Sequence, residues 1–206
     1  MTITVHGSPG HSSRPASACN AISGAIEVIR RLDEGLRFTA SHPALGRPTL
    51  AVNHIRSAPA STHTIQDCCE IGIDRRLLPG EDPDAAVAEI SAIAKTVSGA
   101  KDPASGKPWR VEVVKGPFMY PSLVGGSSKV VGALTRASQV VLGSAPEMFY
   151  QTNAFDQGYL HHIGIETCTY GPGEEKYAHT DLDMASVDRT RDAAKVYAAL
   201  IVQQLA

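Results

Sequence analysis

The sequence is poor in cysteine and in aromatic residues, and it has no cysteine pairs that signal a structural cross-link. Its 206 residues include 4 cysteines and 1 tryptophan, and aromatic residues make up 5%. The cysteines form no C-x-x-C pair, and the adjacent pair at 68 and 69 would point to opposite faces of a strand. We expect all four to be reduced packing residues of a cytoplasmic protein: Cys19, Cys68, Cys69 and Cys168.

Long runs of like charge and long apolar runs are absent as well. The chain carries 19 basic and 21 acidic residues, a net charge of −2 at pH 7, which argues against a nucleic-acid partner because such proteins need a concentrated basic surface. No apolar run approaches the roughly 20 residues of a membrane span. The first residues lack the charged start and apolar middle of a secretory signal. With 43% hydrophobic residues, the chain can still bury a core.

Residues 1–116 alternate between the patterns of strands and helices. Apolar and polar residues alternate in the segments expected to be strands, whereas apolar residues recur every three or four positions in the expected helices. The expected strands span residues 2–7, 48–58, 68–78 and 109–116, and the expected helices span 16–36 and 82–97. The order β-α-β-β-α-β is the split pattern of a ferredoxin-like sandwich, and we expect it to form one domain.

Residues 117–206 read as a partial α/β layer with the order α-β-α-β-α. The expected helices span 129–143, 154–163 and 185–205, and the expected strands lie at 148–150 and 165–171. The last helix places apolar residues such as Val187, Ile201 and Leu205 on one face. Two strands with three helices make a poor sheet, so we expect this segment to be a portion of a larger domain.

Three motifs together resemble one enzyme family. They are "GSPGHSSRPASACNAI" after the first strand, "CEIGIDRRLLPGE" in the middle, and "YGPGEEKYAHTDLD" before the last helix. In this order they resemble the zinc-dependent amide hydrolases that include aminoacylases, acetylornithine deacetylases and succinyl-diaminopimelate desuccinylases. The resemblance covers nearly the whole chain. It implies a lid and dimerisation domain at residues 1–116, followed by the C-terminal part of the α/β catalytic domain at 117–206.

The resemblance gives two histidines a role. His179 matches the last metal ligand of the family, an imidazole presented from a loop, although the acid four places on is Asp183 where Glu is usual. His11 matches the lid histidine, which reaches the active site of the partner subunit and donates a hydrogen bond to the tetrahedral oxyanion. The alternative for each is a loop histidine, solvated at His179 and tucked against prolines at His11.

The resemblance also implies substrate-binding residues. Arg76 matches the arginine that holds a substrate carboxylate, a task suited to the guanidinium fork; the alternative is a surface arginine paired with Asp74 or Glu81. Thirteen positions earlier the family has Asn, where this chain has His63, and Gln66 stands where Pro is common. Thr152 and Asn153 match residues that line the substrate side of the metal site.

The cofactor implied is zinc in a two-metal site, with cobalt or manganese as alternatives. The family supplies four of its five metal ligands and the glutamate base from the half of the catalytic domain that precedes the lid, and we expect these to be absent from this chain. One imidazole cannot fix a catalytic zinc ion, which takes about three protein ligands. Two hypotheses follow: part of an amide hydrolase acting on N-acyl amino acids or similar small amides, inactive as this chain alone, or a non-catalytic assembly module. In both, we expect a homodimer through the lid.

Overall fold

The chain forms two compact units in the computed structural model, which describes residues 1–205. The first unit is Met1–Phe118 and the second begins at Met119. Among the described helices, none combines the length and the apolar character that a membrane crossing requires.

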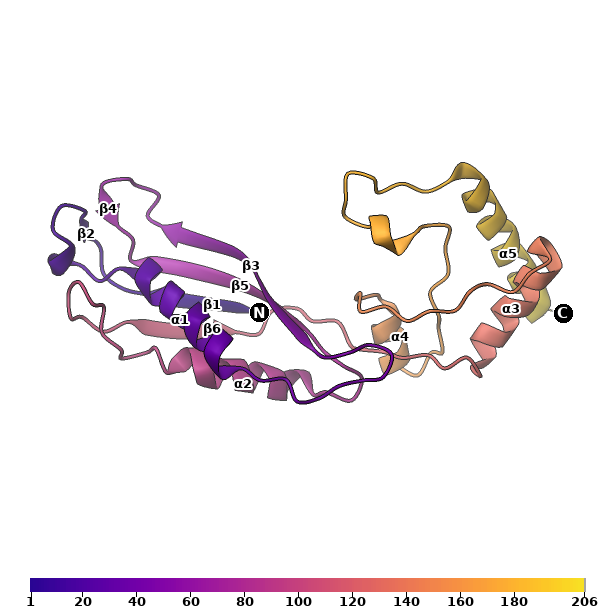
Figure 1. Ribbon diagram of the computed structural model, residues 1–206, viewed down its shortest axis with the longest axis horizontal. Helices are drawn as coiled ribbons and strands as arrows, with labels where there is room; N and C mark the ends of the chain where they lie inside the picture. Colours follow the sequence, from indigo (N-terminus) through magenta and orange to yellow (C-terminus); the bar gives the residue numbers. More distant parts are fainter. Residues whose placement is uncertain (206) are drawn as a thin grey trace. The chain divides into compact units, whose positions relative to one another are not determined.

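The first unit is built on a four-stranded antiparallel sheet (Figure 1). The strands follow the order β3-β5-β1-β6 across the sheet. Together with two helices they give the chain order β-α-β-β-α-β, so the predicted ferredoxin-like arrangement is confirmed. Its elements are β1 (Thr2–His6), α1 (Ala21–Gly35), β3 (Thr49–Ala58), β5 (Cys68–Arg76), α2 (Pro83–Lys95) and β6 (Arg110–Val114).

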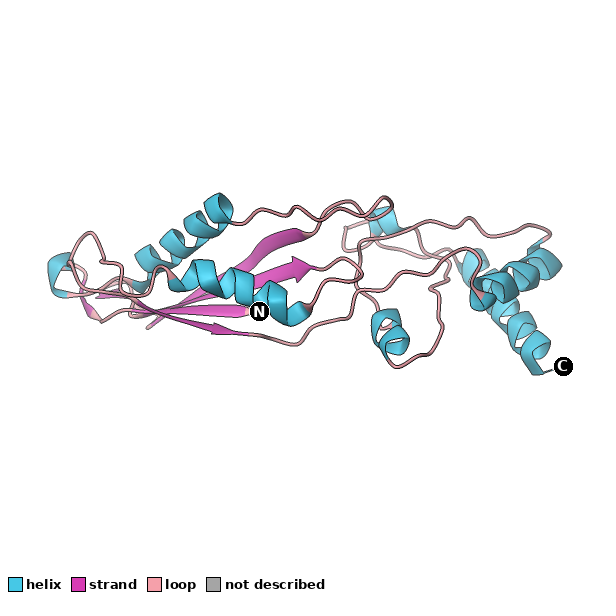
Figure 2. Cartoon of the chain, turned by 90° about the horizontal axis from the view of Figure 1, so that it is seen from below, coloured by secondary structure: helices cyan, strands magenta, loops and turns pink. Residues whose placement is uncertain are grey.

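One face of this sheet carries the core. The helices α1 and α2 lie side by side over that face (Figures 1 and 2). Because side chains alternate along a strand, Ile3 and Val5 of β1 are buried beneath the helices, whereas Thr4 between them turns to the opposite face. The core cluster also contains Val28, Leu32, Cys69, Ile71, Ile73, Ile90, Val97, Trp109 and Val111.

The helices of the first unit begin where their sequences provide caps. The side chain of Asn20 accepts a hydrogen bond from the backbone N–H of Ile22 at 3.0 Å, and Asp82 accepts one from Asp84 at 2.9 Å. Pro83 then occupies the first turn of α2, where its missing N–H leaves no bond unmade. These caps shorten both helices at their N-termini relative to the ranges expected from periodicity.

A second, very small sheet was not predicted. It pairs β2 (Gly10–His11) with β4 (Thr64–Ile65) in antiparallel register, with Gly10 opposite Ile65 and His11 opposite Thr64. Both strands lie in segments that the sequence presents as polar loops. This sheet fixes the position of the histidine loop of the first unit.

The second unit contains three α-helices in its described part: α3 (Lys129–Leu142), α4 (Gln157–His162) and α5 (Val187–Leu205). The helices α3 and α5 pack together, with Leu134, Ala137 and Val196 buried between them. The prediction of the packing face of α5 is wrong. Val187 and Leu205 are 82% and 84% exposed, whereas the helix buries Ala193 and Val196.

The strands expected at 148–150 and 165–171 are not formed, and α4 is shorter than the expected 154–163. Residues 148–150 and 165–171 run without a ladder of backbone hydrogen bonds. A strand requires a neighbour that receives its N–H and C=O groups. Within the described part of the second unit, no segment provides such a neighbour.

Candidate functional site

His11 and His63 lie on adjoining segments at one end of the first unit. His11 is opposite Thr64 in the small sheet, and the backbone N–H of Ser12 donates to the carbonyl of His63 at 3.0 Å. Both histidines are exposed. The structure therefore brings together two of the residues selected from the sequence, although they are far apart along the chain.

The loop that carries His11 is held by its own hydrogen bonds. The backbone N–H of Arg14 donates to the carbonyl of His11 at 2.9 Å. Nδ1 of the imidazole lies 2.7 Å from the hydroxyl of Ser13 and 3.2 Å from the backbone nitrogen of Ser13. Nε2 has no hydrogen-bond partner within residues 1–205 and is the ring nitrogen available to a bound molecule.

Gln66 braces the segment that carries His63. Its side-chain amide donates to the carbonyl of Thr64 at 2.8 Å and to that of Ser61 at 3.2 Å. The hydroxyl of Ser61 in turn accepts from the backbone N–H of His63 at 3.4 Å. The sequence does not predict this role of Gln66, because its only signal there is a departure from the Pro that is common at this position in the family.

Arg76 lies at the opposite end of β5 from the histidines. The strand runs from Cys68 to Arg76, eight steps that span about 26 Å at the usual rise of ~3.3 Å per residue. The guanidinium of Arg76 donates to Asp74 at 2.8 Å and remains 44% exposed. One small molecule therefore cannot contact Arg76 and His11 of the same chain.

Arg75, the neighbour of Arg76, is fixed in the structure. Its side chain is 8% exposed, lies over the ring of Phe38 and donates to Glu81 at 2.7 Å. Its Nε atom is buried without a partner among the described residues. Of the two adjacent arginines, Arg76 presents the more exposed guanidinium, and its pairing with Asp74 is the one named as the alternative to substrate binding.

His179 lies in the second unit, in an unusual backbone conformation. Its φ of 61° is the only positive value of a residue other than glycine in the described chain. Side chains with a Cβ rarely adopt this left-handed region, and such strain often occurs at functional positions. The backbone N–H of His179 donates to the carboxylate of Asp183 at 3.1 Å, which ties the histidine to the acid four places on.

The loop that contains Thr152 and Asn153 lies beside the loop that leads to His179. The side-chain amide of Asn153 donates to Glu175 at 3.2 Å, and Glu175 begins the short 3-10 helix η2 (Glu175–Tyr177). Thr152 is exposed. The second unit therefore places Asn153 beside the segment that leads to His179.

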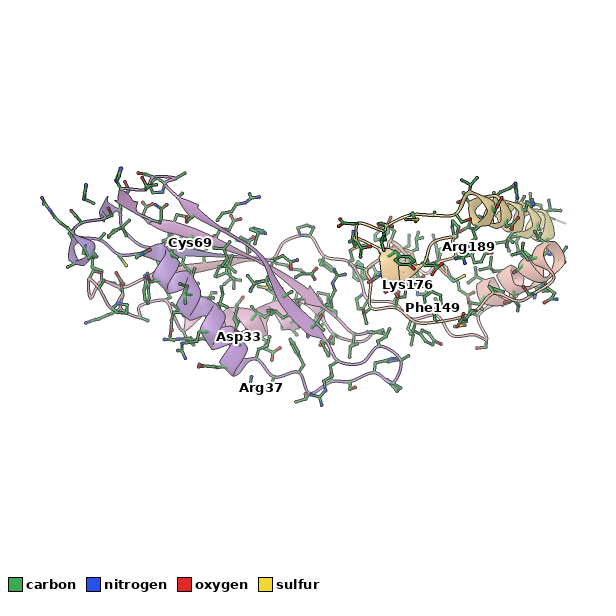
Figure 3. The ribbon with its side chains drawn as sticks, turned by 45° about the horizontal axis from the view of Figure 1, so that its top comes forward. Asp33, Arg37, Cys69, Phe149, Lys176 and Arg189 are labelled. Atoms are coloured by element: carbon green, nitrogen blue, oxygen red, sulfur yellow. The ribbon has the colours of Figure 1, made fainter. Side chains whose placement is uncertain are left out.

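Glu174, which precedes η2, is engaged by two cations. Lys176 and Arg189, labelled in Figure 3, each approach its carboxylate at 2.8 Å. Hydrogen bonds from Lys176 and Arg189 lower the pKa of Glu174 below its ordinary value. Because the lowered pKa makes this carboxylate a weaker base and both cations already engage it, Glu174 is a poor candidate for a general base.

The described residues do not fit a complete metal centre. No three side chains of His, Cys, Asp or Glu come together in residues 1–205 to hold an ion. A zinc site needs about three protein ligands, and His179 can contribute one imidazole. The adjacent histidines of α4 have other partners, since His162 stacks on Tyr120 at 3.8 Å and His161 Nε2 lies 2.9 Å from the carbonyl of Thr167.

The cysteines offer no ligand set either. All four are free. Burial raises the pKa of the Cys19, Cys69 and Cys168 thiols, so these groups remain protonated at neutral pH and pack as small apolar side chains.

Known proteins resemble the chain in both sequence and fold. Residues 1–102 match the peptidase dimerisation domain of the M20 family. The chain is 30% identical to the uncharacterized protein YgeY of Escherichia coli, of which it spans 53%, and 28% identical over 92% of its length to the acetylornithine deacetylase of Yersinia pseudotuberculosis, of which it spans 48%. It thus spans about half the length of these relatives.

Solved structures share the fold, and two of them serve as examples. Aminopeptidase PepT from Bacillus cereus superposes on 97% of the chain with a TM-score of 0.65 and 22% identity, and the chain covers 50% of it. An M20 family metallo-carboxypeptidase from Sulfolobus solfataricus also superposes on 97%, with a TM-score of 0.60 and 14% identity, and the chain covers 57% of it. The motifs, the ferredoxin-like first unit and these similarities agree, and the chain belongs to the M20 family of metal-dependent peptidases and amidohydrolases, whose lid domain it contains.

Proposed function

We propose that the chain is part of a metal-dependent hydrolase that cleaves the amide bond of N-acyl amino acids or related small substrates. The observation that carries the proposal is the β2–β4 sheet, which holds His11 in an exposed loop where one ring nitrogen is not engaged by any described residue. A lid residue of this kind can donate a hydrogen bond to the oxyanion of a tetrahedral intermediate. The acetylornithine deacetylases among the relatives support the choice of an N-acyl amino acid.

The separation of His11 from Arg76 supports a site shared between two subunits. In a two-fold dimer of lids, His11 and His63 of one subunit act on the substrate held by the partner. Arg76 would bind the substrate carboxylate through its guanidinium fork. Thr152 and Asn153 would line the substrate side of the site, next to the loop of His179. His179 would supply one imidazole to zinc, cobalt or manganese, and the other ligands and the base would have to come from outside the described residues.

A non-catalytic dimerisation module is the second candidate. The first unit favours it, because its sheet and two helices enclose a continuous core of their own. Such a lid needs no metal in order to fold and pair. For either function, the charge balance and the free cysteines support a cytoplasmic protein without nucleic-acid or membrane partners.

Two assays separate these functions. The purified chain, supplied with zinc or cobalt, is expected not to hydrolyse N-acetyl amino acids, and chelator-sensitive turnover would contradict that expectation. When the tagged protein is isolated from its own host, any partner that supplies the missing ligands and base can accompany it. We expect this preparation to hydrolyse such a substrate, and we expect the hydrolysis to stop when a chelator is added. There, His11→Ala should lower kcat by roughly 10²–10³, the usual effect of losing an oxyanion donor.

The matched control for the second assay is His42→Ala, which removes a partly exposed histidine from another loop of the first unit and should leave kcat unchanged. Absence of hydrolysis across a panel of N-acyl amino acids would favour the dimerisation module. Full activity in His11→Ala would refute the role of His11.

A further inference from the structure

Ser13 engages the imidazole of His11 in a way that fixes the position of its proton. The backbone N–H of Ser13 points at Nδ1 from 3.2 Å, and the hydroxyl of the same residue lies 2.7 Å from that atom. A backbone N–H can only donate a hydrogen bond. Nδ1 must therefore offer its lone pair, and in the neutral ring the proton then resides on Nε2.

We propose that Ser13 is a positioning residue that holds His11 as the neutral tautomer with its proton on Nε2. This inference rests on the proposed role of His11 as a hydrogen-bond donor and deepens it. The opposite tautomer would present a lone pair at Nε2 and would repel an oxyanion. With Ser13 in place, the nitrogen without a partner is the one that can donate.

The surroundings of His11 hold His11 and Ser13 in fixed positions relative to each other. The β2–β4 pairing fixes His11 opposite Thr64, and the Ser12 N–H to His63 carbonyl bond anchors the next residue. The bond from the Arg14 N–H to the His11 carbonyl closes the turn that contains Ser13. These bonds hold the backbone on both sides of Ser13, so that the Ser13 N–H points at the imidazole of His11.

His42 provides an internal comparison. The backbone N–H of Ala44 donates to Nδ1 of His42 at 3.1 Å, so the same spacing of two residues recurs in a loop that has no proposed part in catalysis. His42 should therefore show the same tautomer as His11. The unfolded chain in urea supplies the reference, because its rings exchange freely between the two tautomers.

The test is the ring ¹⁵N spectrum of the full chain labelled at histidine, recorded without substrate or metal at pH about 8, above the ordinary imidazole pKa of ~6.5. His11 is assigned by the loss of its signals in His11→Gln. We expect Nδ1 of His11 at the position of a bare acceptor nitrogen and Nε2 at that of a protonated one, both shifted from the averaged positions of the unfolded chain. Averaged positions, or a protonated Nδ1, would overturn the inference.

Three variants sharpen the result. Ser13→Ala retains the backbone N–H and should keep the tautomer, whereas Ser13→Pro removes both donors and should shift the His11 signals toward the averaged positions. Ser12→Ala is the matched control and should change nothing. If Ser13→Pro does not fold, the spectra of the wild type and of Ser13→Ala still decide. Because no turnover is measured, a failure here is distinct from a failure of the proposed hydrolase activity.

Discussion

The carboxylate of Asp183 accepts the backbone N–H of His179 at 3.1 Å while His179 holds a φ of 61°. The bond and the left-handed backbone belong to one compact turn. Asp183 therefore shapes the loop by accepting a hydrogen bond from the backbone of His179. Its side chain is shorter than that of the Glu usual in the family, and it is long enough to reach this N–H.

The first prediction concerns the backbone strain at this histidine. Glycine adopts a left-handed conformation freely, whereas a residue with a Cβ resists it by about 1–2 kcal/mol. His179→Gly should therefore make the second unit more stable than His179→Ala does, by about 1 kcal/mol. The difference is measured by far-ultraviolet circular dichroism during urea unfolding. Tryptophan fluorescence is unsuitable, because the one tryptophan, Trp109, lies in the first unit and does not report on the second. Equal stability of the two variants would show that the conformation carries no strain.

The second prediction concerns assembly through the exposed strand β3. This edge strand of the sheet leaves Ile55 50% exposed, and an unpaired edge favours pairing with another copy of the lid. Ile55→Lys should shift the protein from dimer to monomer in sedimentation velocity at micromolar concentration. Val140→Lys, at a 74% exposed position of the second unit, is the matched control. A wild-type protein that sediments only as a monomer contradicts the prediction.

The third prediction compares the two units by hydrogen exchange. The amides of β5 are paired with strands on both sides, whereas residues 165–171 have no ladder and donate only at scattered positions, such as the Ile165 N–H to the Leu160 carbonyl. Amides of 165–171 should exchange faster than those of β5 in the isolated chain. Strong and equal protection of both segments in a monomer would mean that the second unit is self-sufficient.

The fourth prediction is a pH dependence in helix α1. Hydrogen bonds from Arg30 and Arg31 lower the pKa of Glu27 from 4.5 to about 2. Because the folded pKa lies below the unfolded one, the stabilisation is complete above pH 4.5 and disappears as the pH falls toward 2. Since Arg30 is half exposed, we expect only about 1 kcal/mol from this cluster.

Glu27→Gln should therefore lower the urea midpoint at pH 7 and leave it nearly unchanged near pH 2, as followed by Trp109 fluorescence. Glu34→Gln removes a carboxylate of the same helix that pairs with Arg30 alone, so it should have the smaller effect. The same loss in both variants would show that the bonds of Glu27 add nothing specific.

Local patterns were sufficient to predict most of the first unit. Alternation in β1 and β5 and the spacing of apolar residues in α1 and α2 lie within consecutive residues, and these patterns give the right elements within a few positions. The β2–β4 sheet could not be predicted, because two-residue strands have no periodicity and their pairing depends on segments far apart in the chain. The link between Ser13 and His11 had one signal, the hydroxyl residues directly after the histidine.

The second unit shows the limits of periodicity. Helix α5 has two apolar faces, and packing against α3 selects the one with the small Ala193 rather than the one with Ile201. The extended segments of this unit carry strand-like sequences, yet pairing depends on a neighbour that a local pattern does not contain. In β5, the motif selects Arg76, but the cover that Phe38 provides to Arg75 depends on a residue far away in the chain and is visible only in the fold.

The double pairing of β5 restricts how this lid can diverge in evolution. Inserting one residue within Cys68–Arg76 would turn every following side chain to the other face and would expose Ile71 and Ile73 in place of their polar neighbours. The strand therefore behaves as a spacer of fixed length between Arg76 and the histidine end. Gains or losses of residues between His63 and Arg76 are tolerated only ahead of the strand, in the turn that Gln66 braces, so divergence in lid length should accumulate there.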